Sequence, residues 1–100
     1  MLGQRVDDEV VSEVGRLFDI ALPEPATSGY IWSLAKLPPE IQLVKEQRQT
    51  SAYGKPGREL SHRFQLKGTK PGRYKLSFQL KRSWEPKGVD VKLVNVRIDA

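Results

Sequence analysis

The stretch RYKLSFQLK, residues 73–81, indicates the fold class of this chain. Its apolar side chains, Tyr74, Leu76, Phe78 and Leu80, alternate with polar and basic ones. An alternation with a period of two gives a β-strand one apolar face and one wet face. The stretch therefore predicts an antiparallel strand that covers a hydrophobic core on one side.

The same alternation recurs along the chain, and runs of Pro and Gly separate its repeats. Short strands bounded by such turn residues are typical of β-sandwiches. We therefore expect an all-β fold, an immunoglobulin-like antiparallel β-sandwich of about seven strands. The other expected strands lie near residues 10–14, 18–22, 30–34, 41–49, 60–66 and 89–98.

The last of these runs changes phase between Leu93 and Val94. Odd-numbered positions are apolar before this point, and even-numbered positions are apolar after it. A phase change inside one strand needs an extra residue, so we expect a β-bulge here.

Three ring-bearing residues are expected to serve the fold. Trp32 falls on the third strand, where a sandwich often keeps a core tryptophan, and Tyr74 stands where a tyrosine corner would lie. His62, the one histidine, is in phase with apolar neighbours, which favours a half-buried strand histidine over a catalytic one.

Length and composition exclude several classes of function. The chain has 100 residues, a formal net charge of +5 and no cysteine. We expect one domain over residues 1–100, with residues 1–9 frayed. Without cysteine there are no disulfides or thiolate metal sites, and no apolar run reaches the about 18 residues of a membrane span. We expect no metal, no cofactor and no membrane partner, and the acidic run Asp7–Glu9 is interpreted as a solvated terminus rather than a Ca²⁺ site.

The N-terminus has no apolar stretch or small-residue cleavage site typical of a signal peptide. The compartment stays open: a trimmed leader would place the protein in the periplasm or outside the cell, and otherwise it would be cytoplasmic.

Chain direction predicts which connections share an end of the sandwich. Successive strands run up and down, so the second-to-third, fourth-to-fifth and sixth-to-seventh connections meet at one end. That end collects Tyr53, Trp84 and basic side chains, whereas the opposite end has no aromatic residue. Aromatic residues and arginine carry hot spots at interfaces. The alternative for Trp84 is that it folds back over the end of the sandwich as a lid.

The residues of these three connections resemble the chagasin-like inhibitors of papain-family cysteine peptidases. The family motifs are N-P-T-T-G-Y-x-W, a Gly-rich G-x-G-G and R-P-W-x-P, and the resemblance covers about residues 15–98. It implies an immunoglobulin-like sandwich that is not an enzyme, and a reversible inhibitor whose loops enter the active-site cleft of the peptidase. The inhibitor is expected to be a monomer. By this resemblance, loop 1 comprises Pro25, Ala26, Thr27, Ser28, Gly29 and Tyr30, loop 2 comprises Tyr53, Gly54, Lys55, Pro56 and Gly57, and loop 3 comprises Arg82, Ser83, Trp84, Glu85 and Pro86.

Four positions depart from the family motifs. Pro25 replaces Asn and Ala26 replaces Pro in loop 1, Pro56 replaces a glycine in loop 2, and Ser83 replaces the proline of loop 3. Loss of the Asn side chain removes a hydrogen bond that would brace its loop. Proline restricts φ where the family has glycine.

A nucleic-acid-binding or other ligand-binding β-sandwich is the alternative function. Basic residues near the fifth and sixth strands could form one basic sheet face. The outward positions there lack aromatic residues for base stacking, which disfavours nucleic acid as a partner. The basic residues are Arg63, Arg73, Lys75, Lys81 and Arg82.

Overall fold

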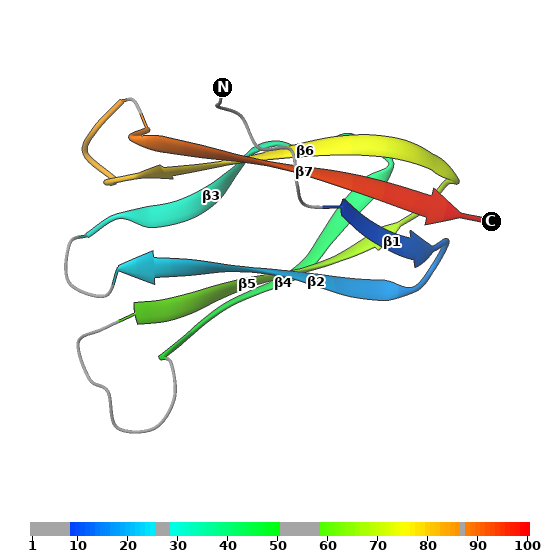
Figure 1. Cartoon of the computed structure of the whole chain (residues 1–100), viewed down its shortest axis with the longest axis horizontal. Helices are drawn as coiled ribbons and strands as arrows, with labels where there is room; N and C mark the ends of the chain where they lie inside the picture. Colours follow the sequence, from blue (N-terminus) through cyan, green and yellow to red (C-terminus); the bar gives the residue numbers. More distant parts are fainter. Residues whose placement is uncertain (1–8, 26–28, 51–58, 87) are drawn as a thin grey trace.

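The computed structural model describes residues 9–25, 29–50, 59–86 and 88–100, and Figure 1 shows how they are arranged. These residues form seven strands and no helix. The strands are β1 (Glu9–Glu13), β2 (Leu17–Pro25), β3 (Ile31–Lys36), β4 (Ile41–Thr50), β5 (Glu59–Gly68), β6 (Gly72–Lys81) and β7 (Asp90–Asp99).

The strands form two sheets that face each other, as Figure 1 shows. One sheet has the order β1-β7-β6-β3 and the other has the order β2-β5-β4. All neighbours are antiparallel except β1 and β7, which pair in parallel. Because the strands alternate in direction along the chain, two odd-numbered strands that become neighbours must be parallel. The expected all-β sandwich of seven strands is confirmed, with this one parallel pair.

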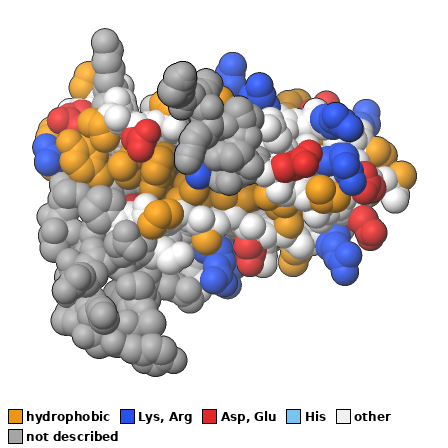
Figure 2. Space-filling view, in the orientation of Figure 1, with side chains coloured by type: hydrophobic (Ala, Val, Ile, Leu, Met, Phe, Trp, Pro, Cys, Tyr) orange, Lys and Arg blue, Asp and Glu red, His pale blue; other side chains and the backbone are white. Residues whose placement is uncertain are grey.

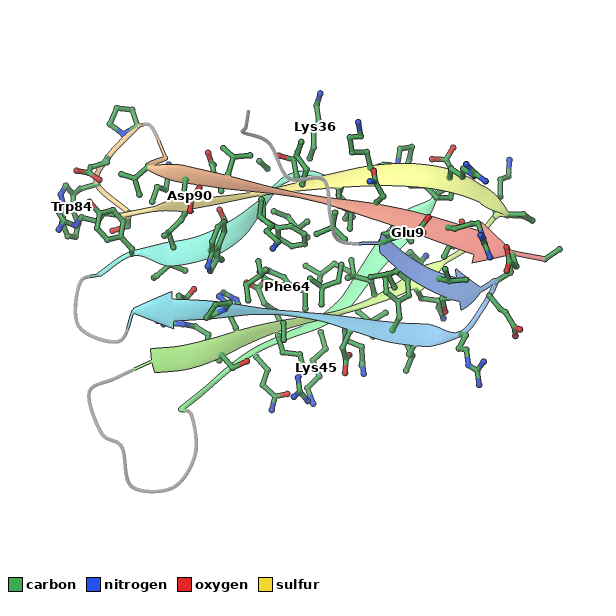
Figure 3. All side chains as sticks on the ribbon, in the orientation of Figure 1. Glu9, Lys36, Lys45, Phe64, Trp84 and Asp90 are labelled. Carbon is green, nitrogen blue, oxygen red and sulfur yellow. The ribbon has the colours of Figure 1, made fainter. Side chains whose placement is uncertain are left out.

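The core lies between the sheets and contains the inward side chains that the alternation predicts. Leu76 and Phe78 of β6 face Phe64 and Leu66 of β5, and all four are fully buried. Figure 3 shows Phe64 between the two layers. Each such side chain is worth about 1.5–3 kcal/mol when it is removed from water. Trp32 is also buried in this core, as expected.

The expected bulge at Leu93 and Val94 is wrong, because β7 pairs with β6 in one continuous register. The strand instead has apolar side chains on both faces. Val94 and Val96 are buried, whereas Val91 and Leu93 are 60% and 38% exposed on the outer face. The change of phase in the sequence marks a change in which face is apolar, and no residue is inserted.

Irregular register occurs elsewhere, between Leu34 and Lys36 in the β3–β6 pair and between Leu43 and Lys45 in the β4–β5 pair. Lys36 and Lys45 point away from the core on opposite sides of the molecule (Figure 3).

The tyrosine corner is confirmed. The Tyr74 hydroxyl donates to the carbonyl oxygens of Lys70 at 2.9 Å and Pro71 at 3.2 Å. Gly72, which follows Pro71, has a φ of +149°, and a Cβ at this position would lie 3.1 Å from the hydroxyl oxygen of Tyr74. Glycine is needed here because other residues rarely adopt such a φ.

The strand ends that border the three connections predicted to meet all lie at one end of the sandwich, on the left in Figure 1. The opposite end contains the connections β3–β4 and β5–β6, which are joined by a hydrogen bond from the Thr69 amide to the Glu40 carbonyl at 2.8 Å. We call the first end the loop end and the second the closed end. The register pairs at the loop end are Pro25–Glu59, Thr50–Leu60, Ile31–Lys81 and Leu80–Asp90.

Candidate functional site

The structure describes part of loop 1 and all of loop 3. Pro25 is the last residue of β2, and Gly29 and Tyr30 precede β3. Ala26, Thr27 and Ser28 of loop 1 lie outside the described residues, as do all five residues assigned to loop 2. Arg82, Ser83, Trp84, Glu85 and Pro86 of loop 3 are described.

Trp84 is exposed at the loop end. Its side chain is 69% accessible to solvent, and Figure 3 shows it at the far tip of the sandwich. The alternative interpretation of Trp84 as a buried lid is therefore wrong, because a lid would hide the indole. An exposed tryptophan on a loop is the type of residue that dominates binding energy at protein interfaces.

Arg82 brings loops 1 and 3 together. Its guanidinium carbon lies 4.3 Å from the centre of the Tyr30 ring and 5.5 Å from the Trp84 ring. Gly29 is also close, since a Cβ built on it would lie 3.5 Å from the Trp84 ring. Arginine over an aromatic face is attracted by the ring electrons, by about 0.5–1 kcal/mol at an exposed site. Residues about fifty positions apart in sequence thus form one rim.

Hydrogen bonds within loop 3 hold its backbone in a tight turn. The Glu85 amide donates to the Arg82 carbonyl at 3.1 Å, and the Lys81 ammonium donates to the Glu85 carbonyl at 3.1 Å. The Val89 amide closes the turn on the Leu80 carbonyl at 2.8 Å. A loop that is ordered before binding loses less conformational entropy when it meets a partner.

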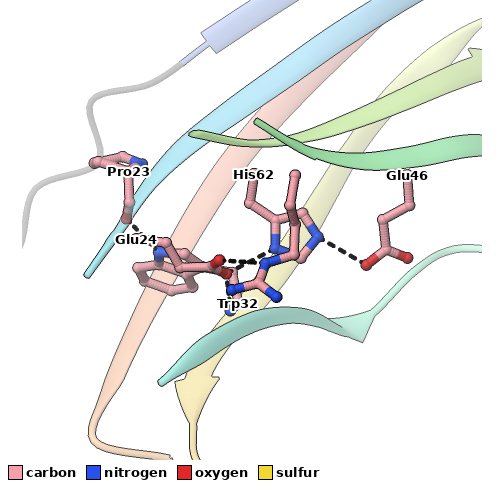
Figure 4. A network of polar contacts seen from close by, with 6 residues as sticks. Pro23, Glu24, Trp32, Glu46 and His62 are labelled. Carbon is pink, nitrogen blue, oxygen red and sulfur yellow. Dashed lines mark hydrogen bonds and ion pairs between the residues drawn. The ribbon is translucent and has the colours of Figure 1, made fainter. Parts of the chain in front are cut away.

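A network of polar contacts, partly buried and centred on Glu24, joins β2 to three other strands, as Figure 4 shows. The fully buried Glu24 carboxylate accepts hydrogen bonds from the Trp32 amide at 2.7 Å, His62 Nδ1 at 2.7 Å and Arg48 Nε at 2.8 Å. The Trp32 indole in turn donates to the Pro23 carbonyl at 2.8 Å. One carboxylate on β2 therefore joins side chains or backbone of β3, β4 and β5.

Burial and hydrogen bonding act in opposite directions on Glu24. Burial disfavours the charged carboxylate and would raise its pKa. The hydrogen bonds from His62, the Trp32 amide and Arg48 favour the charged form, and together they lower the pKa of Glu24 below its ordinary value. Glu24 is therefore a buried anion at neutral pH.

His62 is more deeply buried than the sequence indicates. Its side chain is 2% exposed, its ring stacks on Phe64 at 4.4 Å, and its Nε2 lies 2.8 Å from a Glu46 oxygen. Both ring nitrogens of His62 therefore face carboxylates, that of Glu24 on β2 and that of Glu46 on β4. The sequence analysis missed Glu24, although its place in the inward phase of β2 could have identified it as a partner for the inward His62.

The basic residues singled out for nucleic-acid binding do not lie on one sheet. Arg63 belongs to β5 in one sheet, whereas Arg73 and Lys75 belong to β6 in the other. Figure 2 shows Lys and Arg side chains spread over the visible face rather than gathered in one patch. Within the described ranges, no cluster of His, Asp and Glu is suited to hold a metal ion, and no helix could cross a membrane.

Two solved structures resemble this fold over most of its length. The crystal structure of the cysteine protease inhibitor EhICP2 from Entamoeba histolytica is 21% identical, with a TM-score of 0.76, and the match covers 92% of this chain and 87% of that one. The solution structure of amebosin is 19% identical, with a TM-score of 0.69 and coverage of 91% and 88%. Among curated proteins, none matches the sequence significantly.

A family model also matches the sequence directly. The chagasin family of peptidase inhibitors, I42, matches residues 12–98, which is most of the chain. This family consists of inhibitors, which agrees with the expectation that the protein is not an enzyme. The match also includes all of loops 1, 2 and 3. The chain belongs to the chagasin family of peptidase inhibitors.

Proposed function

We propose that the protein inhibits papain-like cysteine peptidases reversibly, as a monomer, by placing loops 1, 2 and 3 in and beside the active-site cleft. The observation that carries this proposal is the rim of Tyr30, Arg82 and Trp84 at the loop end. It supports a shared binding surface for loops 1 and 3. The similarity to EhICP2, whose structure is that of a cysteine protease inhibitor, supports the class of peptidase.

The chemistry of the rim suits a cleft. Trp84 offers a large rigid ring that is already exposed, and Arg82 holds it beside Tyr30. A prearranged loop fills the groove without presenting a peptide bond for attack, so the inhibitor is not cleaved and dissociates intact. The net charge of +5 would steer the protein toward an acidic cleft.

Titration against papain tests the proposal. The purified protein should inhibit papain with one-to-one stoichiometry, and inhibition should reverse on dilution. SDS gel electrophoresis after long incubation should show an uncut inhibitor. An absence of inhibition at micromolar concentrations would contradict the proposal, as would an inhibitor that is consumed as a substrate.

A further inference from the structure

We infer that Glu24 is a positioning residue for loop 1, and that its carboxylate sets where Gly29 and Tyr30 stand at the loop end. This inference rests on the proposed function. Glu24 lies in β2 shortly before loop 1, and its partner Trp32 lies in β3 shortly after it. The bond from the Trp32 amide to the Glu24 carboxylate, at 2.7 Å, therefore closes the base of the loop (Figure 4).

This closure matters because β2 and β3 belong to different sheets. No ladder of backbone hydrogen bonds joins the two strands, so side chains must fix their spacing. Trp32 provides a second link, since its indole donates to the Pro23 carbonyl at 2.8 Å. Both bonds run from Trp32 in β3 to neighbouring residues of β2, one from its backbone amide and one from its indole. Together they fix the spacing of the two strands at the base of the loop.

His62 and Arg48 hold the carboxylate in place. They approach different oxygens of Glu24, His62 at Oε2 and Arg48 at Oε1, and they come from β5 and β4. Glu46, on the far side of the His62 ring, lies 2.8 Å from Nε2 and helps to fix the ring beside Glu24. The Glu24 side chain therefore has one orientation, the one that also accepts from Trp32.

Stability alone does not explain this network. Apolar residues of similar volume often replace a buried ion pair without loss of stability. A core such as this one, with Phe64 and Phe78 nearby, has apolar neighbours for such a replacement. The network therefore indicates a requirement for geometry at the loop base.

Two matched double variants separate geometry from stability. Glu24→Met with His62→Leu removes the carboxylate that Arg48 and His62 contact, and with it the acceptor for the Trp32 amide. Glu24→Gln with His62→Leu removes the charge of Glu24 and the same imidazole, but keeps an amide oxygen that can accept from the Trp32 amide. We expect the first variant to inhibit papain at least tenfold more weakly than the wild type, and the second to stay within threefold.

Amide hydrogen exchange provides a readout that a purely structural role would not change selectively. In the Met variant, the Trp32 amide loses its acceptor and should exchange at least tenfold faster, while the Phe78 amide stays protected. Tyr74→Phe is the control for general destabilisation, because it removes a hydrogen bond at the closed end and should leave inhibition unchanged.

The outcomes distinguish this inference from the proposed function. If Trp84→Ala weakens inhibition and the Met variant inhibits like the wild type, the positioning role is wrong and the proposed function stands. If the wild type does not inhibit papain, the proposed function fails, and the exchange rates still decide the positioning role.

If the Met variant does not fold, amide hydrogen exchange in the wild-type protein tests the positioning role of Glu24 instead. The Trp32 amide should be as protected as that of Phe78, because its acceptor is buried and held from three sides. Exchange of Trp32 by local opening, with Phe78 still protected, would overturn the inference.

Discussion

The two ends of this sandwich are held by different kinds of interaction. At the closed end, backbone amides and the hydroxyls of Thr69 and Tyr74 donate to carbonyl oxygens, as in the bonds from Thr69 to Glu40 and from Tyr74 to Lys70. At the loop end, a polar network around the buried Glu24 lies at the base of loop 1, and Trp84 is exposed at the rim beside Arg82. The difference supports the proposal that the loop end serves binding as well as stability, whereas the closed end serves stability.

Removal of the Glu24 carboxylate should have the largest effect on stability. Glu24→Ala leaves His62 buried without one partner and leaves the Trp32 amide without an acceptor. Breaking a buried ion pair in this way typically costs about 3–5 kcal/mol. Urea unfolding monitored by tryptophan fluorescence should show this loss, and a change below about 1 kcal/mol would contradict the account of the network.

Acid should remove the same contribution from the wild type. The pKa of Glu24 is lowered in the folded protein, so its contribution is present above the ordinary pKa of glutamate, about 4.3. That contribution is lost as the pH falls through the lowered value. Thermal unfolding at a series of pH values should show this loss in the wild type. The Met/Leu double variant, which lacks Glu24, should lack this component of the acid sensitivity.

Trp84→Ala should separate binding from stability. A hot-spot residue contributes about 2 kcal/mol or more, which corresponds to about a thirtyfold weaker inhibition constant. Because the side chain is 69% exposed, the free energy of unfolding should change by less than about 0.5 kcal/mol. A large loss of stability with unchanged inhibition would reverse the roles assigned to the two ends.

Gly68→Ala tests packing near the closed end. A Cβ at this position would lie 2.7 Å from the Ile98 side chain, which is itself buried. Overpacking of this kind costs about 1–3 kcal/mol. Calorimetry should show the lower stability, and the inhibition constant of the folded variant should equal that of the wild type.

Tyr74→Phe should have the smallest effect. It removes the hydroxyl of the tyrosine corner, and a typical hydrogen bond is worth about 0.5–1.5 kcal/mol. Denaturant unfolding should detect this difference. A measurable change in papain inhibition would show that the closed end influences the loop end.

Much of the fold could be predicted because apolar and polar residues alternate along β2, β5 and β6, and most of the apolar positions in this alternation are buried. The phase change in β7 led to the wrong prediction of a bulge, because Val91 and Leu93 are apolar residues on an exposed face. Alternation alone does not tell which face of a strand is buried. The shared loop end followed from strand direction. The inward phase of Glu24 and His62 could have been read from their strands, which are neighbours in one sheet. The bonds that Trp32 makes to β2 could not be predicted, because they depend on how the two sheets stack, which a period along one strand does not contain.

The central claim is that the loop end is the surface that meets the peptidase. The most direct measurement is an NMR titration of the ¹⁵N-labelled protein with papain whose active-site cysteine is blocked by a small group. The signals of Gly29, Tyr30 and the Trp84 indole should shift or broaden, while those of Thr69 and Lys70 should not. Changes confined to Thr69 and Lys70, with the Trp84 indole unaffected, would contradict the claim.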